Sequence, residues 1–219
     1  MKNSTLHIRD ARPQDASFLA KSILIAGRAH VTRGIWEVIL GGTEEETLLF
    51  LQFLSVTQIP HLFHYSCYLI AEENTFGPVG SLGGYDSNIA GYHALRQAIP
   101  EVARKLSLPA EVSNISEERA KKILTCLPEG IDGAWVIDSV ATLPEHRRKG
   151  VSEKLLRTIL EKGKRQGHSK AQVNMYIGNE PALKLYHKLG FEIVEEIRDA
   201  YFEKSIGSPG MLSLVKDLH

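Results

Sequence analysis

A short basic loop has the residue types of a phosphate-binding site: Arg147, Arg148, Lys149, Gly150, Val151 and Ser152. It follows a strand-type run at 134–142 and opens a helix-type run at 151–165. The first turn of a helix leaves about four backbone N–H groups without intrahelical partners, and the helix dipole adds positive charge there. Because three basic side chains stand at the same place, the loop predicts a bound phosphate or pyrophosphate, and hence a phosphorylated ligand.

The segments on either side of the loop predict a strand–helix–strand unit. The helix at 151–166 carries one apolar face and is followed by Gly167, which suits a helix end. Residues 171–176 alternate in the manner of a second strand. Since a helix joins the two strands, we expect them to form a parallel pair with a right-handed crossover.

The rest of the chain alternates between strand and helix patterns. Further strands are expected at 6–9, 66–72, 79–85, 191–197 and 211–218. Further helices are expected at 13–28, 43–54, 88–106, 115–127 and 179–190. Residues 31–42 fit a loop, and residues 205–210 fit a turn. This order predicts a single α/β domain over 1–219, an α+β mixed sheet with helices on its faces and a helical insertion at about 86–130.

The composition is that of a globular protein with balanced charge. The 219 residues include 26 Lys+Arg and 26 Asp+Glu, so the formal net charge is zero. This balance argues against binding of nucleic acid or an anionic membrane through bulk charge. No apolar run approaches the ~20 residues that span a bilayer, and the N-terminus lacks the apolar core of a signal peptide. Cys67 and Cys126 match no metal spacing, so we expect a cytoplasmic protein with reduced cysteines.

The residues around the basic loop resemble the acetyl-CoA signature of the GNAT N-acetyltransferase superfamily. That signature has an Arg or Gln, two residues, a Gly, one residue, and a Gly or Ala. Arg147 and Gly150 match it, whereas Ser152 departs from it. The downstream matches to the family's pattern are Asn179, Ala182, Tyr186, Gly190 and Phe191. The resemblance is specific over about 134–195 and offers no counterpart for the insertion at 86–130.

The resemblance implies a GNAT acyl-CoA N-acyltransferase fold and an enzyme that moves an acetyl group from acetyl-CoA directly to a primary amine. The residues implied in binding acetyl-CoA are Val140, Thr142, Arg147, Arg148, Lys149, Gly150, Val151, Ser152 and Asn179. Loop N–H groups would hold the pyrophosphate, and the strand end would pair with the pantetheine arm. A backbone N–H of Val140 or Ala141 would stabilise the thioester oxygen. Tyr186 would be the general acid, because a phenol with a pKa of about 10 can protonate the leaving thiolate.

The amine must also lose a proton, and Asp138 is the best candidate for a general base. It lies in an otherwise apolar strand and shares a face with Val140 and Thr142 by two-residue alternation. A buried carboxylate needs a partner. A hydrogen-bonded structural aspartate is therefore an equal alternative, and water could deprotonate the amine without any base.

The resemblance and the composition also indicate which partners and which alternative functions to expect. We expect acetyl-CoA as co-substrate, a small-molecule or peptide amine as acceptor, no metal, no nucleic acid and no membrane, with a homodimer left open. The alternative function is a non-catalytic acyl-CoA-binding sensor with a GNAT fold. A nucleotide-binding protein of another fold is disfavoured, because the chain has neither a GxGxxG nor a P-loop motif.

The sequence gives only weak signals for the residues that bind the acceptor. His61 and His64 stand three residues apart without a third ligand, a pattern more typical of solvated histidines than of a metal site. Trp36 suits either an acceptor pocket or packing between helices. We expect the acceptor to lie between the first two helices, the insertion and the turn at 205–210.

Overall fold

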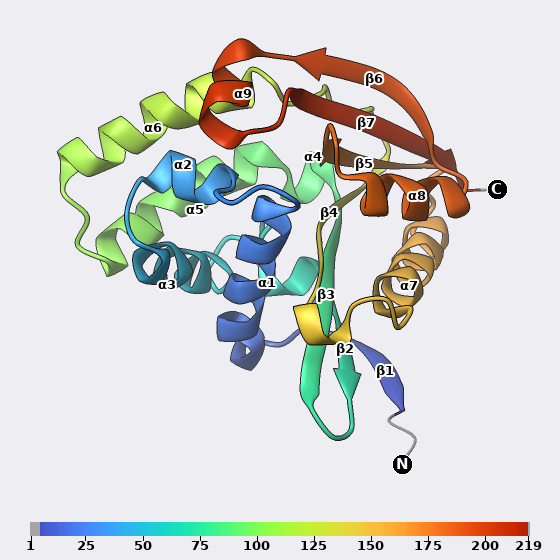
Figure 1. Ribbon diagram of the computed structural model, residues 1–219. Coiled ribbons are helices and arrows are strands. Elements are labelled where there is room, and N and C mark those ends of the chain that lie inside the picture. Colours follow the sequence, from blue (N-terminus) through green and yellow to red (C-terminus); the bar gives the residue numbers. More distant parts are fainter. Residues whose placement is uncertain (1–4, 219) are drawn as a thin grey trace.

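A seven-stranded sheet runs through the molecule, and helices cover both of its faces (Figure 1). The computed structural model describes residues 5–218. The strands are β1 (Leu6–Asp10), β2 (Tyr68–Glu73), β3 (Gly77–Asp86), β4 (Trp135–Thr142), β5 (Lys170–Tyr176), β6 (Glu192–Arg198) and β7 (Gly210–Asp217). Their order in the sheet is β1-β2-β3-β4-β5-β7-β6, with β4 and β5 parallel and the other neighbours antiparallel. The predicted mixed sheet of an α/β fold is confirmed.

The helices include two that the sequence patterns did not predict. The helices are α1 (Ala16–Arg28), α2 (Ile35–Leu40), α3 (Glu44–Leu54), α4 (Ser87–Ala90), α5 (Tyr92–Lys105), α6 (Ala110–Leu124), α7 (Val151–Arg165), α8 (Glu180–Lys188) and α9 (Ala200–Ile206). The loop expected at 31–42 contains α2, and α9 extends into the turn expected at 205–210. Both helices have at most seven residues, too few for an apolar repeat to show.

The second helix of the insertion also begins earlier than its pattern indicated. The expected range was 115–127, whereas α6 spans Ala110–Leu124. Its only buried residue is Ile123, near its end. The first turns of α6 therefore bury no apolar side chains, so no apolar spacing in the sequence could have predicted them.

The two faces of the sheet carry different helices. Ile137 of β4 packs in one apolar cluster with Leu155 and Ile159 of α7. Its neighbour Val136 packs in another cluster with residues of α1, α3 and α5, among them Ile23. The insertion thus adds α5 to the α1–α3 face, while α6 packs mainly on α2 and α9. Within residues 5–218, no helix has the length and apolar character needed to cross a membrane.

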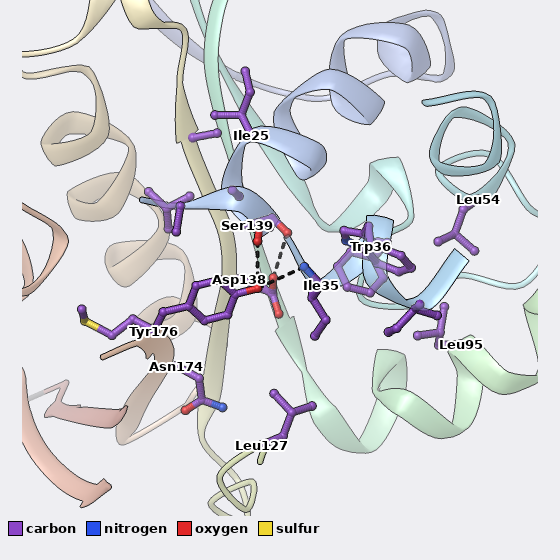
Figure 2. Close-up of a pocket in the computed structure, with 18 of the residues that line it drawn as sticks. Ile25, Ile35, Trp36, Leu54, Leu95, Leu127, Asp138, Ser139, Asn174 and Tyr176 are labelled. Atoms are coloured by element: carbon purple, nitrogen blue, oxygen red, sulfur yellow. Dashed lines mark hydrogen bonds between the residues drawn. The ribbon is translucent and has the colours of Figure 1, made fainter. Parts of the chain in front are cut away.

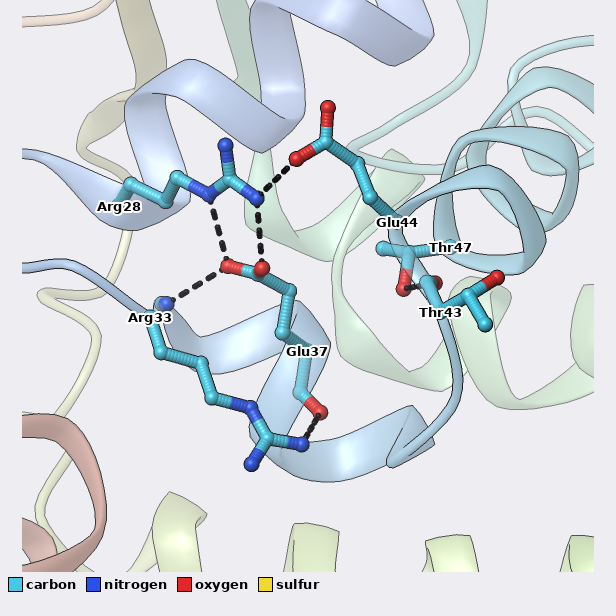
Figure 3. Close-up of polar contacts among 7 residues, drawn as sticks. Arg28, Arg33, Glu37, Thr43, Glu44 and Thr47 are labelled. Atoms are coloured by element: carbon cyan, nitrogen blue, oxygen red, sulfur yellow. Dashed lines mark hydrogen bonds and ion pairs between the residues drawn. The ribbon is translucent and has the colours of Figure 1, made fainter.

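An ion-pair network ties α2 to the end of α1 (Figure 3). The guanidinium of Arg28 donates to both carboxylate oxygens of Glu37, at 2.9 and 2.6 Å, and also to Glu44. Glu37 accepts the backbone N–H of Gly34 at 2.9 Å as well. Since Glu37 is buried and α2 is short, this network constrains where α2 lies.

Substitution of Glu37 with glutamine is expected to lower the free energy of unfolding at pH 7 by about 1–2 kcal/mol. The hydrogen bond from Arg28 holds the pKa of Glu37 below its ordinary value of 4.5 in the folded protein. The stabilisation is therefore complete above pH ~4.5 and is lost as the pH falls through the folded pKa. Denaturant unfolding at several pH values measures it, with Glu45→Gln, an exposed glutamate on α3, as control. A difference that stays constant down to pH 3 would contradict this role.

Candidate active site

The parallel strands β4 and β5 separate partway along their length. Their ladder runs from the pair Trp135–Ala171 to the pair Ile137–Val173 and ends there. Both strands continue beyond this point, β4 to Thr142 and β5 to Tyr176. A wedge-shaped gap therefore opens between them, and the backbone groups that face it have no strand partner.

A β-bulge distorts β4 where this gap begins. In the register with β3, Ser139 and Val140 both lie opposite the single residue Leu82. Ser139 has φ of +50°, in the left-handed region that residues other than glycine rarely adopt. A bulge leaves the extra residue outside the ladder and turns the strand. The backbone at 139–140 is thus released from pairing on both sides.

A cavity of about 1800 Å³ opens from the gap. Ten of the residues expected from the sequence line it: Asp138, Val140, Thr142, Arg147, Arg148, Gly150, Val151, Ser152, Asn179 and Tyr186. Lys149 does not line it and is exposed; it lies between two residues with positive φ, Arg148 (+59°) and Gly150 (+80°). Pockets for one ligand usually have 300–1,000 Å³. The cavity therefore has room for two substrates at once.

The basic loop forms an anion cradle at the start of α7. Gly150 caps the helix in the left-handed conformation, and a Cβ there would meet nothing within 4 Å. Glycine is thus required for its backbone conformation and not for space. The first helical hydrogen bond runs from the N–H of Lys154 to the carbonyl of Gly150. The N–H groups of residues 151–153 are left for a ligand.

Ser152 fills a specific place in this cradle. Its hydroxyl lies 2.8 Å from the Thr142 hydroxyl, in a hydrogen bond that joins the start of α7 to the end of β4. The Nε of Arg147 donates to the Thr142 carbonyl at 3.3 Å. The residue that departs from the signature therefore joins the loop to the strand, which glycine or alanine could not do.

Asp138 lies at the wall of the cavity, beside the bulge (Figure 2). The hydroxyl of Ser139 donates to its Oδ1 at 2.8 Å. Burial raises the pKa of the Asp138 carboxyl above its ordinary value, and this hydrogen bond partly opposes the shift. A carboxylate that is desolvated but open to a cavity is suited to accept a proton.

Tyr186 reaches the cavity from α8. Its ring packs edge-to-face on Phe191, with ring centroids 5.8 Å apart. Burial raises the pKa of the Tyr186 phenol, so it keeps its proton at neutral pH. In the described part of the chain, its hydroxyl has no hydrogen-bond partner. The proton is thus available to a ligand in the cavity.

Two polar residues of β5 reach the same cavity and were not expected from the sequence. The hydroxyl of Tyr176 donates to the carbonyl of Gly27 at 2.8 Å and accepts the N–H of Ile35 at 3.2 Å (Figure 2). It thereby fixes the end of α1 and the start of α2 against the sheet. Asn174 lies two residues earlier and also lines the cavity. Two-residue alternation in the predicted strand would have placed both on one face.

The far wall of the cavity comes from α1, α2, α3 and the insertion helices. Trp36 lies in this wall and packs against Phe63, with ring centroids 4.8 Å apart, and against Phe50 of α3. Residues 205–210, expected to bound the acceptor, do not line the cavity, whereas Met211 does. This segment instead bonds to the residue after β5: the hydroxyl of Ser208 donates to the carbonyl of Ile177 at 2.9 Å.

His61 belongs to a buried hydrogen-bond network and is not solvated as the sequence suggested. Its Nε2 lies 3.0 Å from the Thr57 hydroxyl, and its Nδ1 accepts the N–H of Phe63 at 3.1 Å. Burial lowers its pKa to about 4, so the ring is neutral at physiological pH. His64 is also buried and bonds to Ser66 at 2.7 Å. Both histidines therefore hold the segment between α3 and β2 in place.

Comparisons with known proteins agree with this architecture. Residues 123–191 match the model of the acetyltransferase (GNAT) family. No curated protein matches the chain in sequence. Among solved structures, a crystal structure of an acetyltransferase is 20% identical with a TM-score of 0.71, over 97% of this chain and 100% of that one.

Two further structures share the fold. An N-acetyltransferase from Staphylococcus aureus Mu50 is 23% identical with a TM-score of 0.67, covering 96% of this chain and 100% of that one. The protein yncA from Salmonella typhimurium, solved with its cofactor acetyl-CoA, is 15% identical with a TM-score of 0.52, covering 98% and 94%. The three matches cover 96–98% of this chain.

Proposed function

From its GNAT acetyltransferase fold and its match to that family over residues 123–191, we propose that this protein is an acetyl-CoA-dependent N-acetyltransferase acting on a primary amine. The observation that carries the proposal is the gap between β4 and β5. The anion cradle, the bulged strand, Asp138 and Tyr186 all open into one cavity at this gap. Their position around one cavity supports direct acetyl transfer as the reaction.

The residues at the gap fit acetyl-CoA as a substrate. The free N–H groups at the start of α7 and the side chains of Arg147 and Arg148 offer donors to a pyrophosphate. The unpaired edge of β4 at Val140 and Thr142 offers backbone groups to the amide-bearing pantetheine arm, as in β-strand addition. Asn179, at the start of α8, lines the cavity and can bond to the same arm.

In this proposal, Asp138 and Tyr186 carry out the proton transfers of the reaction. The ammonium form of the amine first gives one proton to solvent. Asp138 then takes a proton from the neutral amine as its nitrogen forms a bond to the acetyl carbon. The carbon–sulfur bond breaks, and Tyr186 gives a proton to the departing thiolate. Backbone N–H groups at the bulge, near Val140, stabilise the charge on the acetyl oxygen. Solvent returns a proton to Tyr186 and removes one from Asp138, which restores the starting state.

Thermal unfolding and a free-thiol assay test the proposal together. Acetyl-CoA is expected to raise the Tm, and amines are expected to release CoA thiol in its presence. S-acetylpantetheine, which lacks the phosphates, should bind much more weakly than acetyl-CoA. A Tm shift without thiol release across a broad amine panel would support an acyl-CoA sensor instead. No shift with any acyl-CoA would overturn both functions.

A further inference from the structure

The half of the cavity lined by α1, α2, α3 and the insertion helices is where we expect the acceptor. Its rim is charged, and its interior is apolar. Four charged residues of the insertion line it, and all four are exposed to solvent: Arg96, Arg104, Glu117 and Lys121. Farther in, the lining is apolar and buried, with Phe50, Leu54, Phe63 and Leu95. Trp36 and Leu127 complete this wall around Asp138 and Tyr176 (Figure 2). A substrate that reaches Asp138 must therefore place its body among hydrocarbon side chains.

Two hydrogen-bond acceptors stand at the inner end of this apolar wall. The carboxylate of Asp138 has the Ser139 hydroxyl as a donor on one oxygen. The amide oxygen of Asn174 is buried and lacks a donor among the described residues. Both residues also line a smaller adjoining cavity of about 270 Å³. A buried acceptor without a donor is unfavourable, and a ligand N–H in this place would remove the deficit.

We propose that the acceptor is a hydrophobic primary amine, with its nitrogen held by Asp138 and Asn174 and its aryl or alkyl body against the wall formed by Trp36 and Leu95. This inference rests on the proposed acetyltransferase function and adds the class of acceptor. A primary amine carries enough N–H donors for both oxygens, and its apolar body gains by leaving water.

Other amine classes match this lining less well. A polyamine would place a second ammonium group among the buried apolar side chains, where an unpaired charge is strongly unfavourable. A peptide would bring backbone N–H and C=O groups into the same region, and the apolar side chains there offer them no partners. Both classes would fit only if their polar parts stayed at the charged rim.

An amine panel in the free-thiol assay separates these classes. With acetyl-CoA saturating, kcat/KM for 2-phenylethylamine and isopentylamine is expected to exceed that for spermidine, lysine and a tetrapeptide by at least about tenfold. Equal or faster reaction of the polar amines would overturn the acceptor class and leave the acetyltransferase function standing. Thiol release with none of the amines would count against the function itself.

Two matched isoleucine variants locate the binding wall. Ile99 lines the cavity and is 40% exposed, whereas Ile115 is 51% exposed on the same insertion and does not line it. Ile99→Glu is expected to raise KM for 2-phenylethylamine at least fivefold while changing KM for acetyl-CoA little, and Ile115→Glu is expected to change neither. Because both side chains are exposed, neither variant should prevent folding. Equal effects of the two variants would contradict the placement.

Tryptophan fluorescence gives a readout that does not depend on turnover. The chain has two tryptophans: Trp36 lines the cavity, and Trp135 lies in the buried cluster on the α7 face. With CoA bound, 2-phenylethylamine is expected to change the emission, and Trp36→Phe should abolish the change. The alcohol 2-phenylethanol has the same body without the ammonium and should bind at least tenfold more weakly. Equal binding of amine and alcohol would show that Asp138 and Asn174 do not hold the nitrogen.

Discussion

Replacing Tyr186 with phenylalanine is expected to lower kcat for acetyl transfer by roughly a hundredfold or more, because general acid catalysis typically contributes 10²–10⁴-fold. Only the hydroxyl is removed, and the ring keeps its edge-to-face contact with Phe191. Binding of acetyl-CoA should stay within about twofold of the original, since the anion cradle is untouched. Stopped-flow or steady-state thiol release measures the rate, and the Tm shift with acetyl-CoA measures the binding.

The control for this variant is Tyr201→Phe. Tyr201 is 38% exposed on α9, does not line the cavity, and is expected to keep full activity. If Tyr186→Phe turns over as fast as the unmodified protein, water protonates the thiolate and Tyr186 is a packing residue. If both binding and turnover fail together, the phenol is needed for the shape of the site.

Asp138→Asn is expected to lower kcat/KM for the amine by roughly a hundredfold and to remove the acidic limb of its pH profile. Burial raises the pKa of this carboxyl, so the base is protonated and inactive at low pH and gains activity as the pH rises through the shifted value. The limb should therefore lie above pH 3.8, the ordinary value for aspartate. Asparagine keeps the size of the side chain and can still accept the Ser139 hydroxyl.

Stability distinguishes a catalytic role of Asp138 from a structural one. A carboxyl with a raised folded pKa weakens the folded state at neutral pH, and that penalty disappears as the pH falls below its ordinary pKa. Asp138→Asn should therefore be at least as stable as the unmodified protein at pH 7, by denaturant unfolding. Asp132→Asn, an exposed residue just before β4, serves as the control. A marked loss of stability would make Asp138 a structural aspartate.

The elements that carry the proposed acetyl-CoA site could be predicted from sequence because their signals are local. A strand, a glycine-containing basic loop and a helix start follow one another within 134–166, and the backbone geometry of each is set by nearby residues. The parallel pairing of β4 and β5 followed from the helix that joins the two strands. The bulge did not, because serine rarely adopts the left-handed conformation that Ser139 has.

The acceptor side depends on contacts between segments far apart in the chain. Tyr176 bonds to Gly27 and Ile35, which lie more than 140 residues away in sequence. The network of Arg28 and Glu37 positions a helix too short for its pattern to be recognised. Periodicity reports which face of a segment is buried, but not which other segment covers it. For that reason the apolar wall around Trp36 emerged only from the folded chain.

The hydrogen bonds among Thr142, Arg147 and Ser152 determine how a ligand meets the basic loop. These internal hydrogen bonds join the loop to the end of β4 and constrain its shape. Little conformational entropy is then lost when a pyrophosphate settles into it, since the receptor is already ordered. Encounter with a polyanion should be governed by diffusion and by the positive charge of Arg147 and Arg148, and it should slow as added salt screens that charge. The serine that breaks the signature thus makes the cradle preorganised.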